Sequence, residues 1–295
     1  MKIETLAAID IGSNAIRLLI SNIEAGASIT DFKKTVFLRL PIRLGEDVFK
    51  KGKIGNRKRE QLTHVMQGFS HIMKACNVSK FRACATSAMR DAANGHAVVQ
   101  RVQKESDIDI EIISGQEEAD MVFEAGGLDK VMGKKTNYLY VDVGGGSTEL
   151  IVYNNQKKVV AESFQIGTVR MISKAVKQGE MRKFKNRLTD IHAHYAPLCI
   201  IASGGNINKA HKLLEKKVSE PVIYPEIKIL YNTLARMTYE ERMHSYNLDT
   251  YRADVIIPAL QIFLLVCDIC KIKDIYVPKV GVVDGIIHQL YYESL

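Results

Sequence analysis

The sequence contains no tryptophan and only five cysteines among its 295 residues. A small, odd number of cysteines argues against a framework of disulfide bonds. The chain shows no aromatic-interleaved basic motif for nucleic-acid binding. The longest apolar stretch, Val255 to Cys267, has 13 residues and includes Pro258, which makes it too short to span a bilayer. We therefore expect neither a nucleic-acid partner nor a membrane.

Two other common signals are also missing. Cys267 and Cys270 have the spacing of a redox motif, but they lie in an apolar helical stretch, and no second pair completes a zinc site. We interpret them as buried, inert thiols. At the N-terminus, Asp10 interrupts the apolar run and no small-residue cleavage site follows, so the pattern is not that of a signal peptide. We therefore expect a cytoplasmic protein.

The composition is that of a soluble globular protein, with 46% apolar and 25% charged residues. A chain of this length can hold two domains of ordinary size. Lysine and arginine exceed aspartate and glutamate by 41 − 33 = 8. A modest positive excess fits an anionic ligand without identifying it. Basic residues cluster at 50–53, 57–59, 182–187 and 209–217. Each cluster alone is best explained as a solvated helix face, whereas together they could form a track for a polyanion.

One pattern occurs twice in the chain. Residues 9–20 align without a gap on residues 141–152, at an offset of 132. Each copy has a short apolar strand ending in an aspartate (Asp10 or Asp142), a turn of small residues, and a second apolar strand. An internal repeat of this kind indicates a duplicated domain.

The chemistry of the two turns suggests a ligand. Small residues let main-chain N–H groups approach an anion closely, and such concavities bind phosphate. Asp10 and Asp142 can each hold a divalent cation, directly or through water. Neither turn is a Walker loop or a dinucleotide fingerprint, because Arg17 and Glu149 lie in second strands rather than helices. We expect two facing hairpin loops that clamp a phosphate chain; a single copy alone would be explained as an ordinary hairpin turn.

The order of elements predicts an α/β protein with two similar lobes and the ligand between them. We expect an N-terminal domain over residues 1–125 and a C-terminal domain over residues 126–295, with a final helix near 282–295 that is able to pack back on the first domain. The pattern also predicts an alternating strand over 108–113 and a long amphipathic helix around residues 62–76.

Glu118 is the best candidate for a catalytic base. Ser114 and Glu117 have capping-box spacing, so Ser114 is expected to cap a helix and the Glu117 side chain to reach back to it. Glu118 is then left on another face of the first turn, where a carboxylate acting as general base is worth about 10²–10⁴ in rate. The alternative is an exposed acid that the helix dipole favours.

Two further strand-to-helix turns have the composition of anion sites. Thr86 and Ser87 lie at a helix start, with Arg90 one turn later, and an arginine fork suits phosphate oxygens. The alternative is an ordinary serine cap with a surface arginine. Gly204 and Gly205 form a similar turn, which we expect to meet the far end of a long ligand or a nucleoside.

Seven motifs in this order resemble the exopolyphosphatase/guanosine pentaphosphate phosphohydrolase (Ppx/GppA phosphatase) family. They are IDIGSNAIRLLI, ATSAMRDAANG, ISGQEEADMVFEA, VDVGGGSTELIV, SFQIGTVRM, ASGGNINKA and RADVIIPAL. The resemblance covers nearly the whole chain. It implies two duplicated ribonuclease H-like domains of the actin, Hsp70 and sugar-kinase superfamily, with an interdomain cleft. It also implies removal of the terminal phosphate from polyphosphate, or of the 5′ γ-phosphate from pppGpp, with Mg²⁺ or Mn²⁺.

The resemblance also assigns roles to residues of this chain. Glu118 would be the catalytic base, Arg90 would contact phosphate, and Asp142 and Glu149 would lie by the metal together with Asp10. The phosphate loops would be Gly12, Ser13 and Asn14 in one copy, and Gly144, Gly145, Gly146 and Ser147 in the other.

The chain departs from the family pattern in two ways. It resembles a short, two-domain form, so a second activity or an extended polyphosphate channel is not expected. The C-terminal motif that commonly reads Arg-Glu-Gly is Val283-Asp284-Gly285 here, which affects either a contact between lobes or a contact with substrate.

Several functions stay open at this point. The leading hypothesis is a Mg²⁺-dependent exopolyphosphatase, which the basic clusters favour over a pppGpp phosphatase. A kinase of the same superfamily would commonly use an aspartate as base, and the Glu118 motif argues against it. A sensor that binds polyphosphate or (p)ppGpp without turnover is disfavoured by complete loops with an intact Glu118. A homodimer is compatible with every one of these readings.

Overall fold

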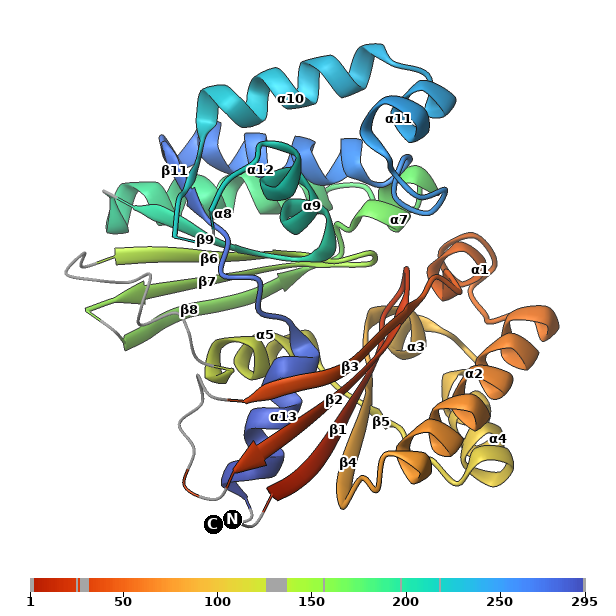
Figure 1. Ribbon diagram of the computed structural model, residues 1–295. Coiled ribbons are helices and arrows are strands. Elements are labelled where there is room, and N and C mark those ends of the chain that lie inside the picture. Colours follow the sequence, from red (N-terminus) through yellow and green to blue (C-terminus); the bar gives the residue numbers. More distant parts are fainter. Residues whose placement is uncertain are drawn as a thin grey trace. The chain divides into compact units, whose positions relative to one another are not determined.

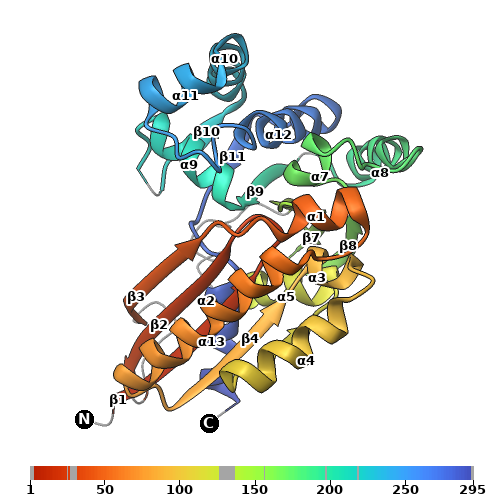
Figure 2. The same ribbon diagram turned by 90° about the vertical axis from the view of Figure 1, so that its right-hand side faces the viewer.

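The computed structural model describes residues 3–24, 26, 32–125, 137–155, 157–196, 198–217 and 219–293 (Figure 1 and Figure 2). The chain forms two compact units. Unit 1 consists of Met1–Gly127 together with Val280–Leu295, and unit 2 of Leu128–Lys279. The last segment of the chain therefore belongs to the same unit as the first. The domain boundary expected at 125/126 adjoins residues 126–136, which are not among the described residues.

The sheet of unit 1 has five strands in the order β3-β2-β1-β4-β5. They are β1 (Ile3–Ile11), β2 (Ile16–Glu24), β3 (Lys33–Leu40), β4 (Lys80–Ala85) and β5 (Glu111–Ile112). The first three are antiparallel, whereas β4 is parallel to β1 and β5 is parallel to β4. The strand expected over 108–113 is shorter than predicted. Ile108 and Ile110 are buried, but only Glu111 and Ile112 pair with β4.

Helices cover both faces of this sheet. They are α1 (Leu44–Lys51), α2 (Asn56–Ala75), α3 (Ser87–Asp91), α4 (Gly95–Ser106), α5 (Gly115–Glu124) and α13 (Val282–Tyr292). In Figure 1, α2 and α4 lie against one face, and α5 and α13 lie against the other. Helix α2 forms because Leu62, Met66, Phe69 and Met73 recur at three- and four-residue spacing, and all four are buried. The long amphipathic helix predicted here is confirmed.

Helix α13 is tied into unit 1 at its first turn. The amide of Gly281 donates to Oδ2 of Asp284 at 2.9 Å, and Asp284 also forms an ion pair with Lys34 of β3. Val283, which replaces the arginine common in the family, is buried. Gly285 lies against the main chain of α5. The motif Val283-Asp284-Gly285 therefore makes three separate contacts with its own unit.

We predict that Gly285→Ala destabilises the protein, because a Cβ there would lie 2.0 Å from the carbonyl oxygen of Met121 in α5. Overpacking of this kind costs about 1–3 kcal/mol. Gly68→Ala in α2 is the matched control, since no atom lies within 4 Å of its Cβ position. Removing a glycine from a helix interior should stabilise by about 0.5–1 kcal/mol. Urea unfolding measures both, and equal effects would show that the α5–α13 contact is not close.

Unit 2 repeats the strand arrangement of unit 1. Its six-stranded sheet has the order β10-β11-β9-β6-β7-β8. The strands are β6 (Asn137–Val143), β7 (Thr148–Asn154), β8 (Lys157–Phe164), β9 (Cys199–Ser203), β10 (Val222–Ile223) and β11 (Asp274–Tyr276). Strands β6, β7 and β8 are antiparallel, and β9 and β11 add in parallel, as β4 and β5 do in unit 1. The expected duplicated α/β architecture is confirmed; the short antiparallel edge strand β10 was not predicted.

Helix α12 forms the centre of the helical layer of unit 2. The helices are α7 (Thr168–Ile172), α8 (Glu180–Tyr195), α9 (Gly205–Leu213), α10 (Tyr224–Arg236), α11 (Tyr239–Tyr246) and α12 (Ile256–Cys270). In Figure 1, α8 and α12 lie against one face of the sheet. Helix α12 contains most of the longest apolar stretch, and it is buried on nearly all sides. Across the described ranges, no helix is long and apolar enough to cross a membrane.

The cysteine pair of α12 is buried, as expected. Cys267 and Cys270 are both free thiols. Burial raises the pKa of each to about 12, because a thiolate would lose its hydration. Since the thiolate is the reactive form, neither side chain is suited to redox chemistry.

His211 of α9 makes the stability of unit 2 depend on pH. Its side chain is completely buried, and Nε2 lies 3.3 Å from the carbonyl oxygen of Glu220. Burial lowers the pKa of His211 from 6.5, because the imidazolium form is desolvated. The unfolded chain then binds this proton more readily than the folded chain.

We predict that the His211 contribution is unchanged above pH 6.5, and that stability is lost as the pH falls below 6.5. Urea unfolding from about pH 7.5 to about pH 5.5 should show a smaller loss for His211→Gln than for wild type. NMR titration of the imidazole should give a value below 6.5. A value at or above it would contradict the assignment.

Candidate functional site

The two small-residue loops are hairpin turns with the same internal geometry. In loop 1 (residues 12–15), the amide of Gly12 donates to the carbonyl of Ala15 at 3.1 Å. In loop 2 (residues 144–147), the amide of Gly144 donates to the carbonyl of Ser147 at 3.0 Å. These residues correspond at the offset of 132. The predicted hairpin turns are therefore confirmed, with β1 pairing with β2 and β6 with β7.

A second segment holds each loop through main-chain hydrogen bonds. The amide of Gly45 donates to the carbonyl of Ser13 at 2.9 Å, and that of Val169 donates to the carbonyl of Gly145 at 2.8 Å. Ser13 and Gly145 are 132 residues apart, whereas Gly45 and Val169 are 124 apart. Both donors lie at the start of the helix that follows the third strand of their sheet. We call these segments clasp 1 (residues 42–46) and clasp 2 (residues 167–170).

The two clasps complete their contacts differently. In unit 1, the amide of Arg43 donates to the carbonyl of Asn14 at 3.0 Å. In unit 2, the equivalent carbonyl, that of Gly146, accepts from Nε of the buried Arg170 at 2.7 Å. One contact is thus made by the main chain and the other by a guanidinium.

The sequence analysis missed both clasps. Their main-chain contacts leave no side-chain signature, and the change of offset from 132 to 124 removes them from the ungapped repeat. The motif SFQIGTVRM, which contains clasp 2, was the available signal.

The aspartates at the strand ends have unlike partners. Asp10 is in register with Arg17 and forms an ion pair with it, whereas Asp142 is in register with Glu149. Burial raises the pKa of Asp10, although Arg17 acts in the opposite direction. Asp142 and Glu149 are both buried, and Oε1 of Glu149 accepts a hydrogen bond from Ser163 Oγ at 2.8 Å. At this position of the hairpin, unit 1 therefore has an aspartate opposite an arginine, whereas unit 2 has an aspartate opposite a glutamate.

The carboxylate pair is the part of unit 2 with the chemistry of a metal site. Among the described residues, no group of three or more His, Cys, Asp or Glu side chains is placed to hold a metal ion. Mg²⁺ is commonly bound by one or two carboxylates together with substrate phosphates. Asp142 and Glu149 fit a Mg²⁺ site made of two carboxylates and substrate phosphates. In such a site, the bound substrate supplies the remaining ligands.

In unit 1, the predicted site residues gather where β1, β4 and β5 end. The amide of Thr86 donates to the carbonyl of Ile11 at 3.2 Å, so the end of β4 lies beside loop 1. The hydroxyls of Ser13 and Ser87 are 2.7 Å apart, and both side chains are buried. The carboxyl ends of neighbouring parallel strands meet at one edge of a sheet, where ligands of α/β proteins commonly bind.

The start of α5 lies at the same edge. Ser114 and Glu117 form the predicted capping box, with the Glu117 amide 3.1 Å from Ser114 Oγ and the Ser114 amide 2.7 Å from Glu117 Oε2. These bonds hold the pKa of Glu117 below its usual value. Arg90 Nη1 donates to the carbonyl of Ile113 at 2.6 Å. Glu118, half-buried in the first turn, is therefore one residue from a fixed cap.

The turn at Gly204 and Gly205 lies beside loop 2. Gly204 has a φ of 114°, and a Cβ there would lie 2.8 Å from the carbonyl oxygen of Val143 and 3.3 Å from Oδ1 of Asp142. Only glycine suits this combination of backbone angle and contact. Arg252 Nη1 donates to the carbonyl of Gly205. The glycine turn thus packs directly against the end of β6 that carries Asp142.

Residues 19–293 match the family described as the Ppx/GppA phosphatase family. The chain belongs to this family. Among its relatives, the bifunctional 3-dehydroquinate synthase/phosphatase of Fusobacterium nucleatum is 36% identical over 173 residues, covering 57% of this chain and 26% of that protein. Exopolyphosphatase 1 of Mycobacterium tuberculosis is 30% identical over 167 residues, covering 56% of this chain and 47% of that protein. The aligned parts thus span about a quarter to a half of these curated relatives.

Solved structures of the family share the fold. The crystal structure of the Ppx/GppA family member from Aquifex aeolicus has a TM-score of 0.78 at 24% identity, covering 99% of both chains. That of an exopolyphosphatase from Cytophaga hutchinsonii has a TM-score of 0.85 at 22% identity, covering 98% of both chains. The α/β architecture with two sheets is therefore the architecture of this family.

We predict that Gly167→Ala disrupts loop 2, because a Cβ at position 167 would lie 2.5 Å from main-chain atoms of Gly145 and Gly146. The expected cost is about 1–3 kcal/mol. Gly281→Ala is the matched control. Both glycines precede a helix with similar φ, −140° and −146°, but a Cβ at 281 has no neighbour closer than 4.0 Å.

The measurement is urea unfolding together with hydrogen exchange at the amides of loop 2. Faster exchange in Gly167→Ala alone is the expected result. If both variants behave as wild type, clasp 2 does not pack on loop 2.

Proposed function

We propose that this protein is an exopolyphosphatase, which releases the terminal phosphate of inorganic polyphosphate. The observation that carries the proposal is the buried pair Asp142 and Glu149 beside the glycine loop of unit 2. A divalent cation and a polyphosphate chain have the charges that such a loop and pair would bind. Membership of the Ppx/GppA phosphatase family supports the same class of substrate.

In this proposal Asp142 and Glu149 hold Mg²⁺ or Mn²⁺. Oxygen ligands are those that these hard cations prefer. When bound, the ion would neutralise charge on the phosphoryl oxygens. Asp10, the third predicted ligand, is ion-paired with Arg17. We assign the metal first to Asp142 and Glu149, because two carboxylates are in register there across β6 and β7.

Glu118 acts as general base. Its carboxylate lies in the first turn of α5, where the helix dipole favours a negative charge. The carboxylate accepts a proton from water while the water oxygen forms a bond to the terminal phosphorus. The bridging P–O bond breaks in line, and its electron pair leaves on the shortened chain. Base catalysis of this kind is worth about 10²–10⁴ in rate.

The remaining site residues bind the phosphate oxygens. We assign this role to both loops and to Arg90, whose guanidinium suits phosphate geometry. Thr86 and Ser87 add hydroxyl donors in unit 1. The turn at Gly204 and Gly205 would meet a more distant part of the substrate.

A pppGpp 5′-phosphohydrolase with the same site is the alternative. A guanosine-5′-triphosphate,3′-diphosphate pyrophosphatase of Aeromonas salmonicida aligns over 96% of this chain at 24% identity, covering 59% of that protein. A putative exopolyphosphatase of Haemophilus influenzae aligns over 98% of this chain at 22% identity, covering 92% of that protein, so the breadth of match supports both candidates. A regulator that binds either ligand without turnover is a third, weaker candidate.

The deciding experiment is phosphate release from long-chain polyphosphate and from pppGpp, each with Mg²⁺ and with EDTA. Faster release from polyphosphate, abolished by EDTA, is the expected result. Preference for pppGpp would replace the proposed substrate. No release from either compound, with binding retained, would leave the regulator.

We predict that Glu118→Gln lowers kcat by about 10²–10⁴, because the amide cannot accept the proton. Glu117→Gln is the matched control, since glutamine also completes a capping box. Its kcat should stay close to wild type. Equal turnover in the two variants would exclude Glu118 as the base.

A further inference from the structure

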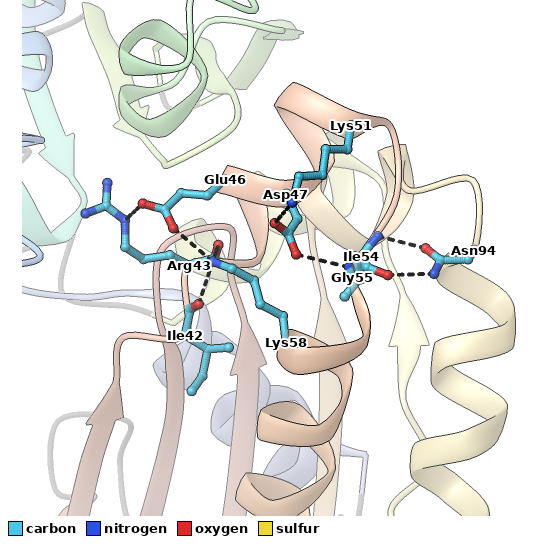
Figure 3. A network of polar contacts seen from close by, with 9 residues as sticks. All are labelled: Ile42, Arg43, Glu46, Asp47, Lys51, Ile54, Gly55, Lys58 and Asn94. Carbon is cyan, nitrogen blue, oxygen red and sulfur yellow. Dashed lines mark hydrogen bonds and ion pairs between the residues drawn. The ribbon is translucent and has the colours of Figure 1, made fainter.

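Clasp 1 is held by a partly buried lysine on another helix (Figure 3). Lys58 lies in the first turn of α2, and its side chain is only 14% exposed. Nζ lies 3.0 Å from the carbonyl of Ile42 and 3.0 Å from Oε2 of Glu46, and it also donates to the carbonyl of Arg43. An ammonium group has three hydrogens to donate. Lys58 therefore directs all of them at clasp 1.

The clasp residue that Lys58 contacts has an unfavourable backbone conformation. Arg43 has φ 56° and ψ 50°, in the left-handed region. For a residue other than glycine this costs about 1–2 kcal/mol. Such a conformation persists only when its surroundings fix it. Lys58 bonds the carbonyl of Arg43, and Glu46 forms an ion pair with Arg43 Nε at 2.9 Å.

Clasp 1, fixed in this way, holds loop 1. The amides of Arg43 and Gly45 donate to Asn14 and Ser13. A continuous chain of contacts therefore runs from the Lys58 ammonium, through two clasp carbonyls and two clasp amides, to the main chain of loop 1. The first and last steps are hydrogen bonds, and the covalent main chain of clasp 1 joins them.

The position of Lys58 is itself set by a second group of contacts. The amide of Gly55 donates to Oδ2 of Asp47 at 3.0 Å, which ties the start of α2 to α1. The side chain of Asn94 bonds both the amide and the carbonyl of Ile54, each at 2.9 Å. Figure 3 shows these contacts around the short link between the two helices. These contacts fix the start of α2, and with it the position of the Lys58 main chain.

Unit 2 holds the equivalent carbonyl of its loop through a different contact. The guanidinium of Arg170 bonds the carbonyl of Gly146 directly. In unit 1 the equivalent bond comes from the amide of Arg43, so its direction depends on the backbone of the clasp. By bonding the carbonyls of Ile42 and Arg43, Lys58 holds the clasp backbone that directs this amide.

We propose that Lys58 is a positioning residue, which sets the phosphate affinity of loop 1 through clasp 1. The proposal rests on the proposed function, since it concerns how loop 1 binds a phosphate chain. Lys58 does not touch the substrate. Its removal weakens binding by letting the Ser13–Asn14 main chain depart from its binding geometry.

The first test separates KM from kcat in phosphate release. Lys58→Met should raise KM about fivefold or more, with kcat changed less, because a loop that is no longer held in its binding geometry must be ordered when phosphate binds. Lys58→Arg should restore most of the affinity. Lys51→Met is the control, since the Lys51 side chain is 65% exposed and its ammonium pairs with Asp47 at 3.2 Å, outside clasp 1. A merely structural role would lower the active fraction and Tm while KM stayed at the wild-type value.

The second test does not depend on turnover. Hydrogen exchange at the amides of Arg43 and Gly45 should be about fivefold faster or more in Lys58→Met, and unchanged in Lys51→Met. If Lys58→Met does not fold, Lys58→Gln, with two donors in place of three, takes its place. Unchanged exchange would overturn the proposal whatever the substrate. Faster exchange in a protein that releases no phosphate would refute the proposed function and leave the role of Lys58 in loop geometry intact.

Discussion

The site depends on a few main-chain hydrogen bonds from clasp to loop. A loop made of glycine, serine and asparagine has no large side chains to anchor its own shape, and its conformational freedom is high. In both units the missing constraint comes from the segment after the third strand, through Gly45 to Ser13 and through Val169 to Gly145. The loop can then offer small residues to a ligand while its backbone is held from behind. The small residues of the loop allow a ligand to approach the main chain closely, and the clasp keeps that main chain rigid.

The duplication preserved the backbone and changed the charges. At the strand ends, unit 1 pairs Asp10 with Arg17, whereas unit 2 sets Asp142 opposite Glu149. The repeated hairpin therefore carries a different set of charges in each unit. In the proposed function the metal is assigned to the acidic pair of unit 2.

Local patterns predicted much of the fold and part of the site. The hairpin loops, α2 and the cap at Ser114 follow from short-range spacing, and the structure contains each of them. Contacts between distant segments could not be predicted in this way. The bond from Gly45 to loop 1 involves main-chain atoms that every residue has, and nothing in the sequence near Lys58 indicates that it crosses to Arg43. The roles of the site residues in catalysis rest on family resemblance and stay predictions.

The return of α13 to unit 1 has a consequence for biosynthesis. This helix packs against β1, so a strand that precedes the whole of unit 2 in the chain is covered by a helix that follows unit 2. Unit 2 is continuous in the chain and can complete its core first, whereas unit 1 exposes part of its sheet until α13 has been synthesised. Domains generally fold in the order in which they are synthesised. Here unit 2 can be completed before unit 1, and the nascent unit 1 has an apolar face that is open to chaperones until α13 has been synthesised.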